Sequence, residues 1–304
     1  RCTALLRPAA FLRVNYMSEA MPEELTWNVH GLRFAAMAWG DPGKPPLLAL
    51  HGWLDNAASF APLAPRLADT FYVVAPDLSG HGRSDWRSAD ATYQVYDDLP
   101  QIRGIVEQLG WSSFALMGHS RGAVIASLFA AAFPELVSRL VLLDGVASSS
   151  LEAEGYVEQM RRFVVDKERL LQRKYRVFET EQEAVTVREE QGLDRASAEL
   201  IALRNLRPCD GGLTWSTDPR LRGASAVKMT RAQIDVMLKS LVMPSLLLAA
   251  KEGLVVQHPK AFASLPERMP DLQLEQWPGG HHFHMENGVV TLAQRLRQFL
   301  LDPD

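Results

Sequence analysis

Short apolar runs alternate along the chain with longer segments in which apolar residues recur every three or four positions. The short runs predict buried strands, and the recurring spacing predicts amphipathic helices. Eight strands are predicted, in TWNV, LRFAAMAWG, PPLLALHG, FYVVAPD, SSFALMG, SRLVLLDG, MPSLLLAA and LQLEQWP. Helices are predicted in NAASFAPLAPRLAD, YQVYDDLPQIRGIVEQLG, RGAVIASLFAAAF, HPKAFASLPERM and VVTLAQRLRQFL. This alternation predicts an α/β fold, with a mostly parallel eight-stranded sheet and helices on both faces.

Between residues 147 and 240 the strand pattern stops. The stretch LEAEGYVEQMRRFVVDKERLLQRKYRVFETEQEAVTVREE is rich in Arg and Glu and has helical spacing. The later stretch PCDGGLTWSTDPR is dense in turn residues and predicts a loop. Because the strand pattern resumes with MPSLLLAA, we predict a helical cap at residues 147–240, inserted into an α/β core formed by residues 19–146 and 241–304.

The first residues, RCTALLRPAAFLRVNYMSEA, carry three arginines and no acidic residue before Glu19. Such a composition resembles a transit-like leader. We interpret residues 1–18 as a leader, or as upstream sequence translated together with the protein, in which case Met17 is the natural start.

The composition is that of a globular protein and argues against nucleic-acid-binding and membrane-spanning proteins. Hydrophobic residues make up 47% of the 304 positions and charged residues 22%, as in ordinary globular proteins. The net charge of −4 argues against a nucleic-acid partner, and the most apolar stretch, residues 122–133, is shorter than the roughly 20 residues that a membrane span needs. Cys2 and Cys209 form no metal-binding or disulfide pattern. We therefore expect a cytoplasmic protein with no membrane span.

A single serine, Ser120, lies in GHSRG, between a predicted strand and a predicted helix. The pattern G-x-S-x-G in this setting is typical of a nucleophile elbow, a sharp turn that lifts the serine above the carboxyl end of the strand. Gly118 and Gly122 would allow the close backbone approach that such a turn needs. We therefore predict that Ser120 is a nucleophile; the alternative is an ordinary strand-to-helix turn that contains a small hydroxyl.

A serine hydroxyl needs a neighbouring base before it attacks a carbonyl. When the nucleophile lies in such an elbow, the base is a histidine near the end of the chain. His281 follows a predicted strand and a Gly-Gly turn in EQWPGGHHFHMENG, so we predict His281 as the base. His282 and His284 are close to it, but the three histidines show no regular ligand spacing with a carboxylate. We therefore predict neither a metal site nor a cofactor.

Acyl transfer by a serine also needs backbone N–H groups that face the oxygen on which negative charge develops. The elbow itself supplies one such donor, the amide of Arg121. The second is expected in HGWLDN, directly after a buried strand, where the glycine allows close approach and the Trp53 amide is the natural donor. The Arg121 side chain is expected to form an ion pair, with attraction of an anionic substrate as the alternative.

Four stretches, HGWLDNAASF, DLSGHGRSD, GHSRG and GGHHFHM, resemble the α/β-hydrolase superfamily in their order and spacing. The serine hydrolase-like proteins are the members of that superfamily that they resemble most closely. The resemblance implies the α/β-hydrolase fold, with Ser120 as nucleophile, His281 as base, and the amides of Trp53 and Arg121 as the oxyanion hole. The resemblance to this superfamily is weakest in the predicted cap, residues 147–240.

The third member of a catalytic triad does not stand where the resemblance implies it. The usual aspartate follows the strand after the cap, and in LLLAAKEGLVV that place is taken by Gly253, with Glu252 one residue early. A shift of one residue at the end of a strand turns the side chain to the other face. Asp144, at the end of SRLVLLDG, is the preferred candidate, because some haloalkane dehalogenases carry their acid at this strand end, and Glu252 is the alternative. Two further alternatives stay open: a Ser–His dyad that works without an acid, or an inactive relative of the hydrolases.

These residues predict a cofactor-independent, carboxylesterase-like serine hydrolase. Its small-molecule acyl substrate would be an ester, a thioester or a lactone, cleaved through an acyl-enzyme on Ser120. Epoxide and haloalkane hydrolysis are disfavoured, because in this fold those reactions use an aspartate at the elbow. Hydrolysis of carbon–carbon bonds and cofactor-free peroxidase activity stay open. The alternative from another class is a non-catalytic binding or signalling protein on a hydrolase scaffold.

Overall fold

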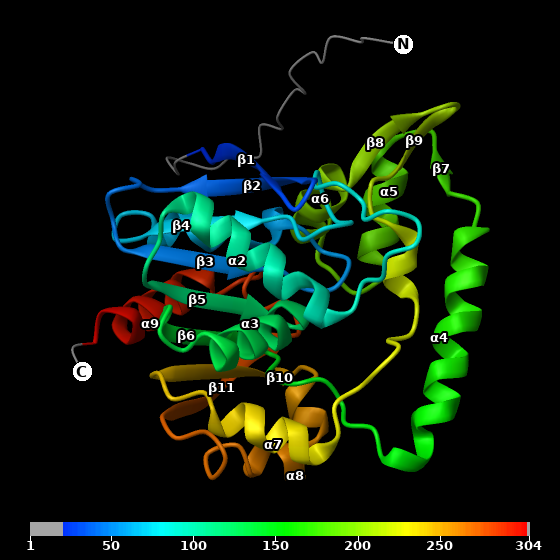
Figure 1. Ribbon diagram of the computed structural model, residues 1–304. Coiled ribbons are helices and arrows are strands. Elements are labelled where there is room, and N and C mark those ends of the chain that lie inside the picture. Colours follow the sequence, from blue (N-terminus) through cyan, green and yellow to red (C-terminus); the bar gives the residue numbers. More distant parts are fainter. Residues whose placement is uncertain (1–20, 303–304) are drawn as a thin grey trace.

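The centre of the molecule is one sheet of eight strands (Figure 1). A computed structural model describes residues 21–302, so the leader predicted at residues 1–18 lies outside the described residues. The strands follow the order β1-β2-β4-β3-β5-β6-β10-β11. Their bounds are β1 Glu23–Val29, β2 Leu32–Trp39, β3 Pro46–Leu50, β4 Tyr72–Pro76, β5 Phe114–His119, β6 Val137–Leu143, β10 Ser245–Glu252 and β11 Leu272–Gly280. Strand β2 pairs antiparallel with β1 and β4, and the other pairs are parallel. The predicted mostly parallel eight-stranded sheet is confirmed.

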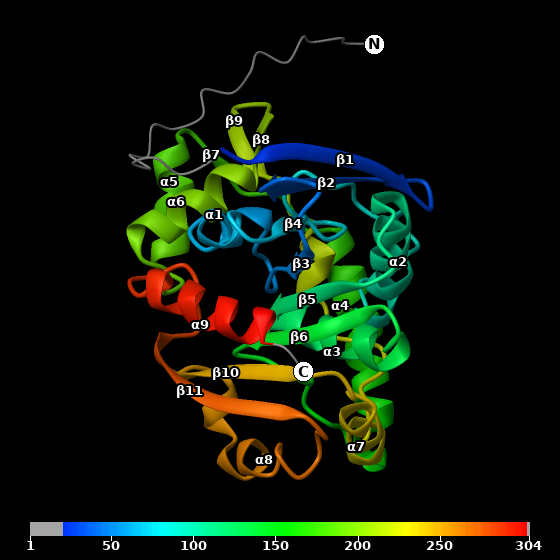
Figure 2. The same cartoon turned by 90° about the vertical axis from the view of Figure 1, so that its left-hand side faces the viewer.

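Helices cover both faces of this sheet (Figure 2). On one face lie α2 (Asp98–Leu109), α3 (Arg121–Ala132) and α7 (Arg231–Lys239), and on the other lie α1 (Ala64–Leu67) and α9 (Val289–Leu301). In β3, Leu48 and Leu50 belong to the first layer of the core, whereas Leu47 and Ala49 belong to the second. Because both faces are covered, the strand is apolar at successive positions instead of alternating with polar residues.

The helix predicted in NAASFAPLAPRLAD is present only in two short pieces. They are the 3₁₀ helix η1 (Ala57–Phe60) and the single turn α1. Asn56 caps the first piece, because its side chain accepts a hydrogen bond from the Ala58 amide at 3.0 Å. Pro62 and Pro65 explain the interruption, since proline lacks the N–H that a continuous helix requires.

Most of the segment between residues 147 and 240 lies along the right-hand side of Figure 1, whereas its last helix, α7, lies at the bottom of that view. It contains the helices α4 (Tyr156–Leu171), α5 (Glu181–Glu189) and α6 (Arg195–Arg204), as expected. The expectation that it holds no strand is wrong: β7 (Val177–Phe178), β9 (Gly212–Trp215) and β8 (Leu206–Cys209) form a small antiparallel sheet. Strands of two to four residues are too short for a periodic pattern. The one available signal was Asp210-Gly211, a typical hairpin turn.

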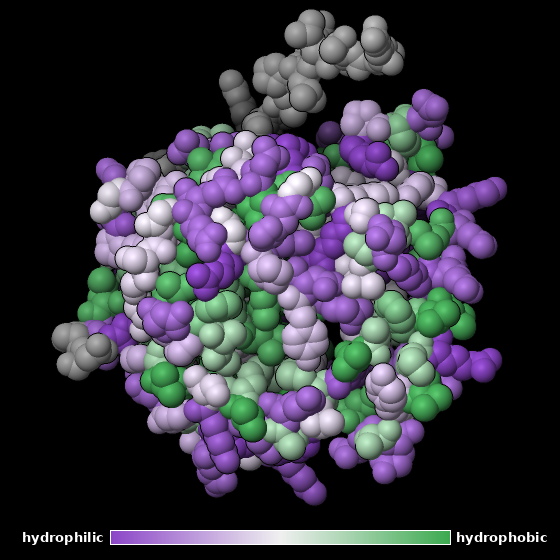
Figure 3. Space-filling model, viewed as in Figure 1, coloured by the Kyte–Doolittle hydropathy of each residue, from purple (hydrophilic) through white to green (hydrophobic). Residues whose placement is uncertain are grey.

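The outer surface of this segment is not uniformly polar. Helix α4 exposes Val157, Val164 and Val165, and Figure 3 shows apolar side chains among polar ones along the edge where α4 lies. Helix α7, by contrast, packs against α3 in the main core. The division into core and cap at residues 147 and 240 stays a prediction. No helix in residues 21–302 has the length and the apolar content required to cross a membrane.

The loop after β4 joins the core to α6 through the buried carboxylate of Asp77. This carboxylate accepts hydrogen bonds from the Ala57 amide at 2.7 Å and the Arg83 amide at 2.9 Å. It also pairs with the guanidinium of Arg204 at 2.9 Å. Burial alone would lower the pKa of Arg204, but the charges and hydrogen bonds of Asp77 and Glu24 raise that pKa above its ordinary value. Asp77 therefore holds together three segments that are distant in the sequence.

We expect the Asp77→Ala variant to lose about 3 kcal/mol or more of unfolding free energy, because a buried cation then loses a partner. Equilibrium urea denaturation measures the loss. The control is Arg33→Ala, which removes an ion pair between the exposed side chains of Arg33 and Asp85 and is expected to cost less than about 1 kcal/mol. Equal losses in the two variants would contradict the structural role of Asp77.

Candidate active site

Ser120 lies at the junction between β5, which ends at His119, and α3, which begins at Arg121. Its backbone has φ 53° and ψ −116°, a strained conformation that residues with a side chain rarely adopt. Within residues 21–302, three of the four non-glycine residues with positive φ, namely Leu54, Ser120 and Asp144, lie in loops at this end of the sheet. Backbone strain of this kind gathers at functional sites.

Two glycines make the sharp turn at Ser120 possible. A Cβ on Gly118 would lie 2.4 Å from the carbonyl oxygen of Gly122, and a Cβ on Gly122 would lie 2.1 Å from the carbonyl oxygen of Leu50. Any larger residue at either position would therefore collide with backbone. The close approach expected from GHSRG is present, and the turn holds the serine at the N-terminus of α3, where the helix dipole favours negative charge.

His281, in the loop that follows β11, is hydrogen-bonded to Asp144. The ring N–H at Nδ1 donates to Asp144 Oδ2 over 2.6 Å. The Asp144 carboxylate is buried, and it also accepts hydrogen bonds from the amides of Ala250 at 3.1 Å and Leu254 at 2.8 Å. With Nδ1 protonated, the neutral ring carries its lone pair on Nε2. This arrangement gives His281 the tautomer of a general base.

Of the two acids that the sequence left open, the structure brings Asp144 and not Glu252 to the histidine. Glu252 is exposed at the end of β10. Gly253 lies directly against the Asp144 carboxylate, since a Cβ on Gly253 would come within 2.3 Å of Asp144 Oδ2. The space that a side chain at position 253 would occupy is therefore filled from the neighbouring strand end.

His119 connects the turn at Ser120 to the loop that carries His281. Its Nε2–H donates to the carbonyl oxygen of His281 over 2.8 Å, and the centroids of the two rings are 4.6 Å apart. Because Ser120 is the next residue after His119, this contact fixes the loop after β11 beside the turn at Ser120.

The two expected oxyanion donors differ in what their side chains do. The Arg121 side chain forms the expected ion pair, with 2.7 Å between its Nη2 and Asp98 Oδ2. Its amide is the first of α3, and such amides have no acceptor within the helix. Trp53 uses its indole N–H to bind the Leu221 carbonyl oxygen at 2.8 Å. In the described part of the chain, no acceptor contacts the Trp53 amide.

A cavity of about 500 Å³ opens beside Ser120 and Asp144. Apolar side chains line much of its wall, among them Val124, Ile234, Leu238, Leu254, Phe262 and Leu265. They come from α3, α7 and the region of α8 (Pro259–Ala263). A second cavity of about 250 Å³ lies among residues of the cap segment and is not lined by Ser120.

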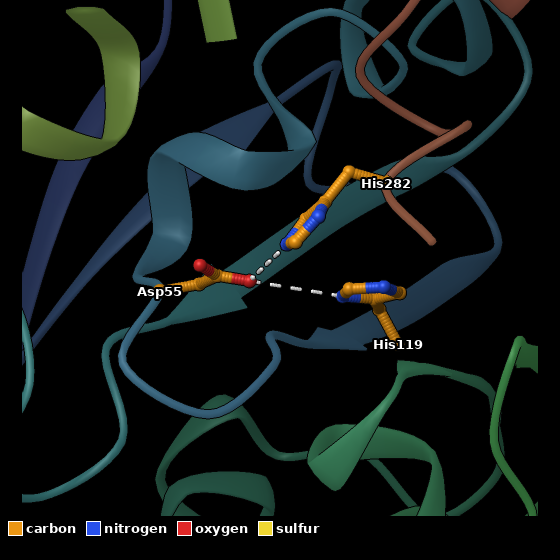
Figure 4. Close-up of side chains that lie close together, drawn as sticks. All are labelled: Asp55, His119 and His282. Carbon is orange, nitrogen blue, oxygen red and sulfur yellow. Dashed lines mark hydrogen bonds and ion pairs between the residues drawn. The ribbon is translucent and has the colours of Figure 1, made fainter. Parts of the chain in front are cut away.

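A second carboxylate, Asp55, lies beside the histidines and was not among the residues predicted from the sequence. Its Oδ2 is 3.2 Å from His282 Nε2 and 3.8 Å from His119 Nδ1 (Figure 4). These donor atoms all lie within 4.8 Å of one another, a spacing that could hold a metal ion. The sequence gives little sign of the group, because Asp55 and His282 are separated by 227 residues.

Comparisons with known proteins agree with the fold. Residues 45–288 match the family model of the alpha/beta hydrolase fold. A serine hydrolase-like protein of Dictyostelium discoideum is 34% identical over 289 residues, which cover 90% of this chain and 79% of that protein. A serine hydrolase-like protein of Danio rerio is 31% identical over 265 residues, which cover 82% of this chain and 79% of that protein.

Solved structures of other proteins have the same fold. A hypothetical protein from Pseudomonas aeruginosa PAO1 superimposes with a TM-score of 0.87 at 35% identity, covering 92% of this chain and 100% of that one. A thioesterase domain from the curacin biosynthetic pathway gives a TM-score of 0.81 at 26% identity. The match covers 91% of this chain and 100% of that domain. Together with the family match and the names of its relatives, this supports a hydrolase. The chain belongs to the α/β-hydrolase fold family.

Proposed function

We propose that this protein is a cofactor-independent serine hydrolase that cleaves a carboxylic ester, a thioester or a lactone. The observation that carries the proposal is the 2.6 Å hydrogen bond between His281 Nδ1 and the buried Asp144 carboxylate, in a loop that is tied to the elbow of Ser120. Each group suits one role in a nucleophile–base–acid triad, and such triads are recognised by geometry and not by position in the sequence.

In the proposed mechanism, Ser120 Oγ attacks the carbonyl carbon of the substrate while His281 Nε2 accepts the hydroxyl proton. Asp144 stabilises the imidazolium that forms, and the amides of Trp53 and Arg121 donate to the developing oxyanion. Collapse of the tetrahedral intermediate breaks the bond to the leaving group, which receives the proton from His281. Water, deprotonated by the same ring, then attacks the acyl-enzyme and releases the acid and free Ser120.

The cavity beside Ser120 supports an apolar acyl group. Leu238, Ile234 and Leu265 are nearly fully buried in its wall, and such apolar side chains favour an alkyl chain. The wall is not wholly apolar, because it also contains Arg121, Arg231 and Arg268. The likeness to a thioesterase domain supports a thioester among the three substrate types. Carbon–carbon bond hydrolysis remains the alternative reaction for the same triad.

The test is covalent labelling with a fluorophosphonate, followed by mass spectrometry and assays with p-nitrophenyl esters of increasing chain length. An activated serine reacts with the probe, so we expect one adduct, on Ser120. We also expect kcat/KM to rise with acyl length until the cavity is filled. The control is heat-denatured protein, which has lost the elbow and should not react.

Absence of an adduct from the folded protein would favour the alternative, a non-catalytic binding or signalling protein on a hydrolase scaffold. An adduct on another residue would contradict the assignment of the nucleophile.

A further inference from the structure

Three donor atoms from three separate segments of the chain meet beside the proposed catalytic residues (Figure 4). Asp55 follows β3, His119 ends β5, and His282 follows β11. Asp55 and His119 are almost completely buried, and the His282 side chain is 22% exposed. Because the three segments are far apart in the sequence, the fold itself builds this group.

The tautomer of His119 is the first reason to regard the group as a ligand site. The Nε2–H of His119 donates to the carbonyl oxygen of His281, so the lone pair of the neutral ring lies on Nδ1. In the part of the chain that the structure describes, Nδ1 is buried and has no hydrogen-bond partner. Metal-binding histidines commonly donate their other ring N–H to a backbone carbonyl in this way.

A carboxylate oxygen, which is not a donor, lies close to this lone pair. Asp55 Oδ2 lies 3.8 Å from His119 Nδ1. The carboxylate is buried, and its Oδ2 faces the Nδ1 of His119, which lacks a hydrogen-bond partner among the described residues. A lone pair and a carboxylate oxygen therefore face each other, and a cation would satisfy both.

The remaining contacts orient the carboxylate without covering Oδ2 from all sides. Arg188 Nη2 lies 3.4 Å from the other oxygen, Asp55 Oδ1, and also binds the Leu54 carbonyl oxygen. Gly52 keeps the approach open, because a Cβ there would lie 2.8 Å from Asp55 Oδ2 and 2.9 Å from His119 Nδ1. Only a residue without a side chain fits beside the two ligand atoms.

We propose that Asp55 Oδ2, His119 Nδ1 and His282 Nε2 bind one divalent transition-metal ion, and that Zn²⁺ is the ion that these donors suit. Zn²⁺ binds histidine and carboxylate at about 2.0–2.2 Å, which sets tetrahedral donor atoms roughly 3.3 Å apart. The separations of 3.2 and 3.8 Å from Asp55 Oδ2 are close to this value, and all three donor atoms lie within 4.8 Å of one another, so a small inward movement of the two rings completes the site. On binding, the neutral His282 ring takes the tautomer with its proton on Nδ1, so that Nε2 exchanges its N–H hydrogen bond with Asp55 for a bond to the ion.

The ion would join the loops that carry the proposed oxyanion donor, nucleophile and base. Trp53 is two residues before Asp55, Ser120 follows His119, and His281 precedes His282. We therefore expect Zn²⁺ to stabilise the folded protein, because a ligand that binds only the folded state raises its stability.

The test uses untagged protein that has been stripped with a chelator, and isothermal titration calorimetry with ZnCl₂. We expect one Zn²⁺ per chain, a higher thermal unfolding midpoint with Zn²⁺, and no binding of Mg²⁺, which prefers oxygen ligands. His282→Ala and Asp55→Asn should each weaken Zn²⁺ binding by more than the roughly 10–100-fold that loss of an outer-shell partner costs. Circular dichroism checks that both variants are folded.

Three control variants separate this site from others. His258→Ala removes an exposed histidine at the start of α8, Cys209→Ser removes a free thiol, and His281→Ala removes the ring that is paired with Asp144. All three should bind Zn²⁺ like the wild type. Unchanged affinity in both His282→Ala and Asp55→Asn, loss of binding in any control, or no binding by the wild type would overturn the proposal. Binding is measured directly, so a failure of the proposed hydrolysis would leave this result unaffected.

Discussion

The Ser120→Ala variant should lose about 10⁶-fold in kcat toward an activated ester, the size of loss known for a serine nucleophile in another hydrolase. The change removes one oxygen and keeps Cβ, so the strained backbone at φ 53° carries the same side-chain bulk as before. Initial rates with purified variant and wild type measure the loss, and circular dichroism verifies the fold.

The double variant makes this prediction sharper. His281→Ala alone should cost nearly as much as Ser120→Ala, because each residue of the unit is ineffective without the other. The combination should therefore be no slower than Ser120→Ala. Losses that multiply in the double variant would mean that the two residues act independently, which contradicts a nucleophile–base pair.

Asp144→Asn should lower kcat by about 10⁴-fold, as the equivalent change does in a serine protease. Asp144 Oδ1 and Oδ2 each accept a hydrogen bond from a backbone amide, and Oδ2 also accepts from His281. An amide group at this position has only one acceptor oxygen, so its NH₂ would donate to His281 Nδ1 and place the ring proton on Nε2. That tautomer cannot accept the serine proton.

The matched control is Glu252→Gln, one residue before Gly253. Its side chain is exposed, so the change should leave kcat within about twofold of the wild type, as a surface substitution away from the chemistry does. A near-normal Asp144→Asn beside an inactive Glu252→Gln would reverse the choice of acid. Near-normal rates in both variants would indicate that Ser120 and His281 work without a carboxylate.

Most of the fold followed from local patterns. The inner strands of the sheet were predicted because each is apolar over several residues, and the GHSRG turn was predicted because its glycines and its setting are specific. The strands of the cap segment were missed because β7 has two residues and β8 and β9 have four each.

The chemistry of the site was less visible in the sequence wherever it depends on contacts between distant residues. The partner of His281 was one of two candidates until the fold brought Asp144 to within 2.6 Å. Asp55 was not considered, because only the packing of the β3 loop against the β11 loop brings it to His282. Periodicity records which face of an element is buried, but it does not record which side chains meet across loops.

The contact between Gly253 and Asp144 means that the two strand ends compete for one space beside His281. A side chain introduced at position 253 would place its Cβ within 2.3 Å of Asp144 Oδ2 and 2.6 Å of Ala250 Cβ, so the Asp144 carboxylate would have to shift. An acid could therefore be transferred from one strand end to the other only if the Asp144 side chain gave up its present position against His281.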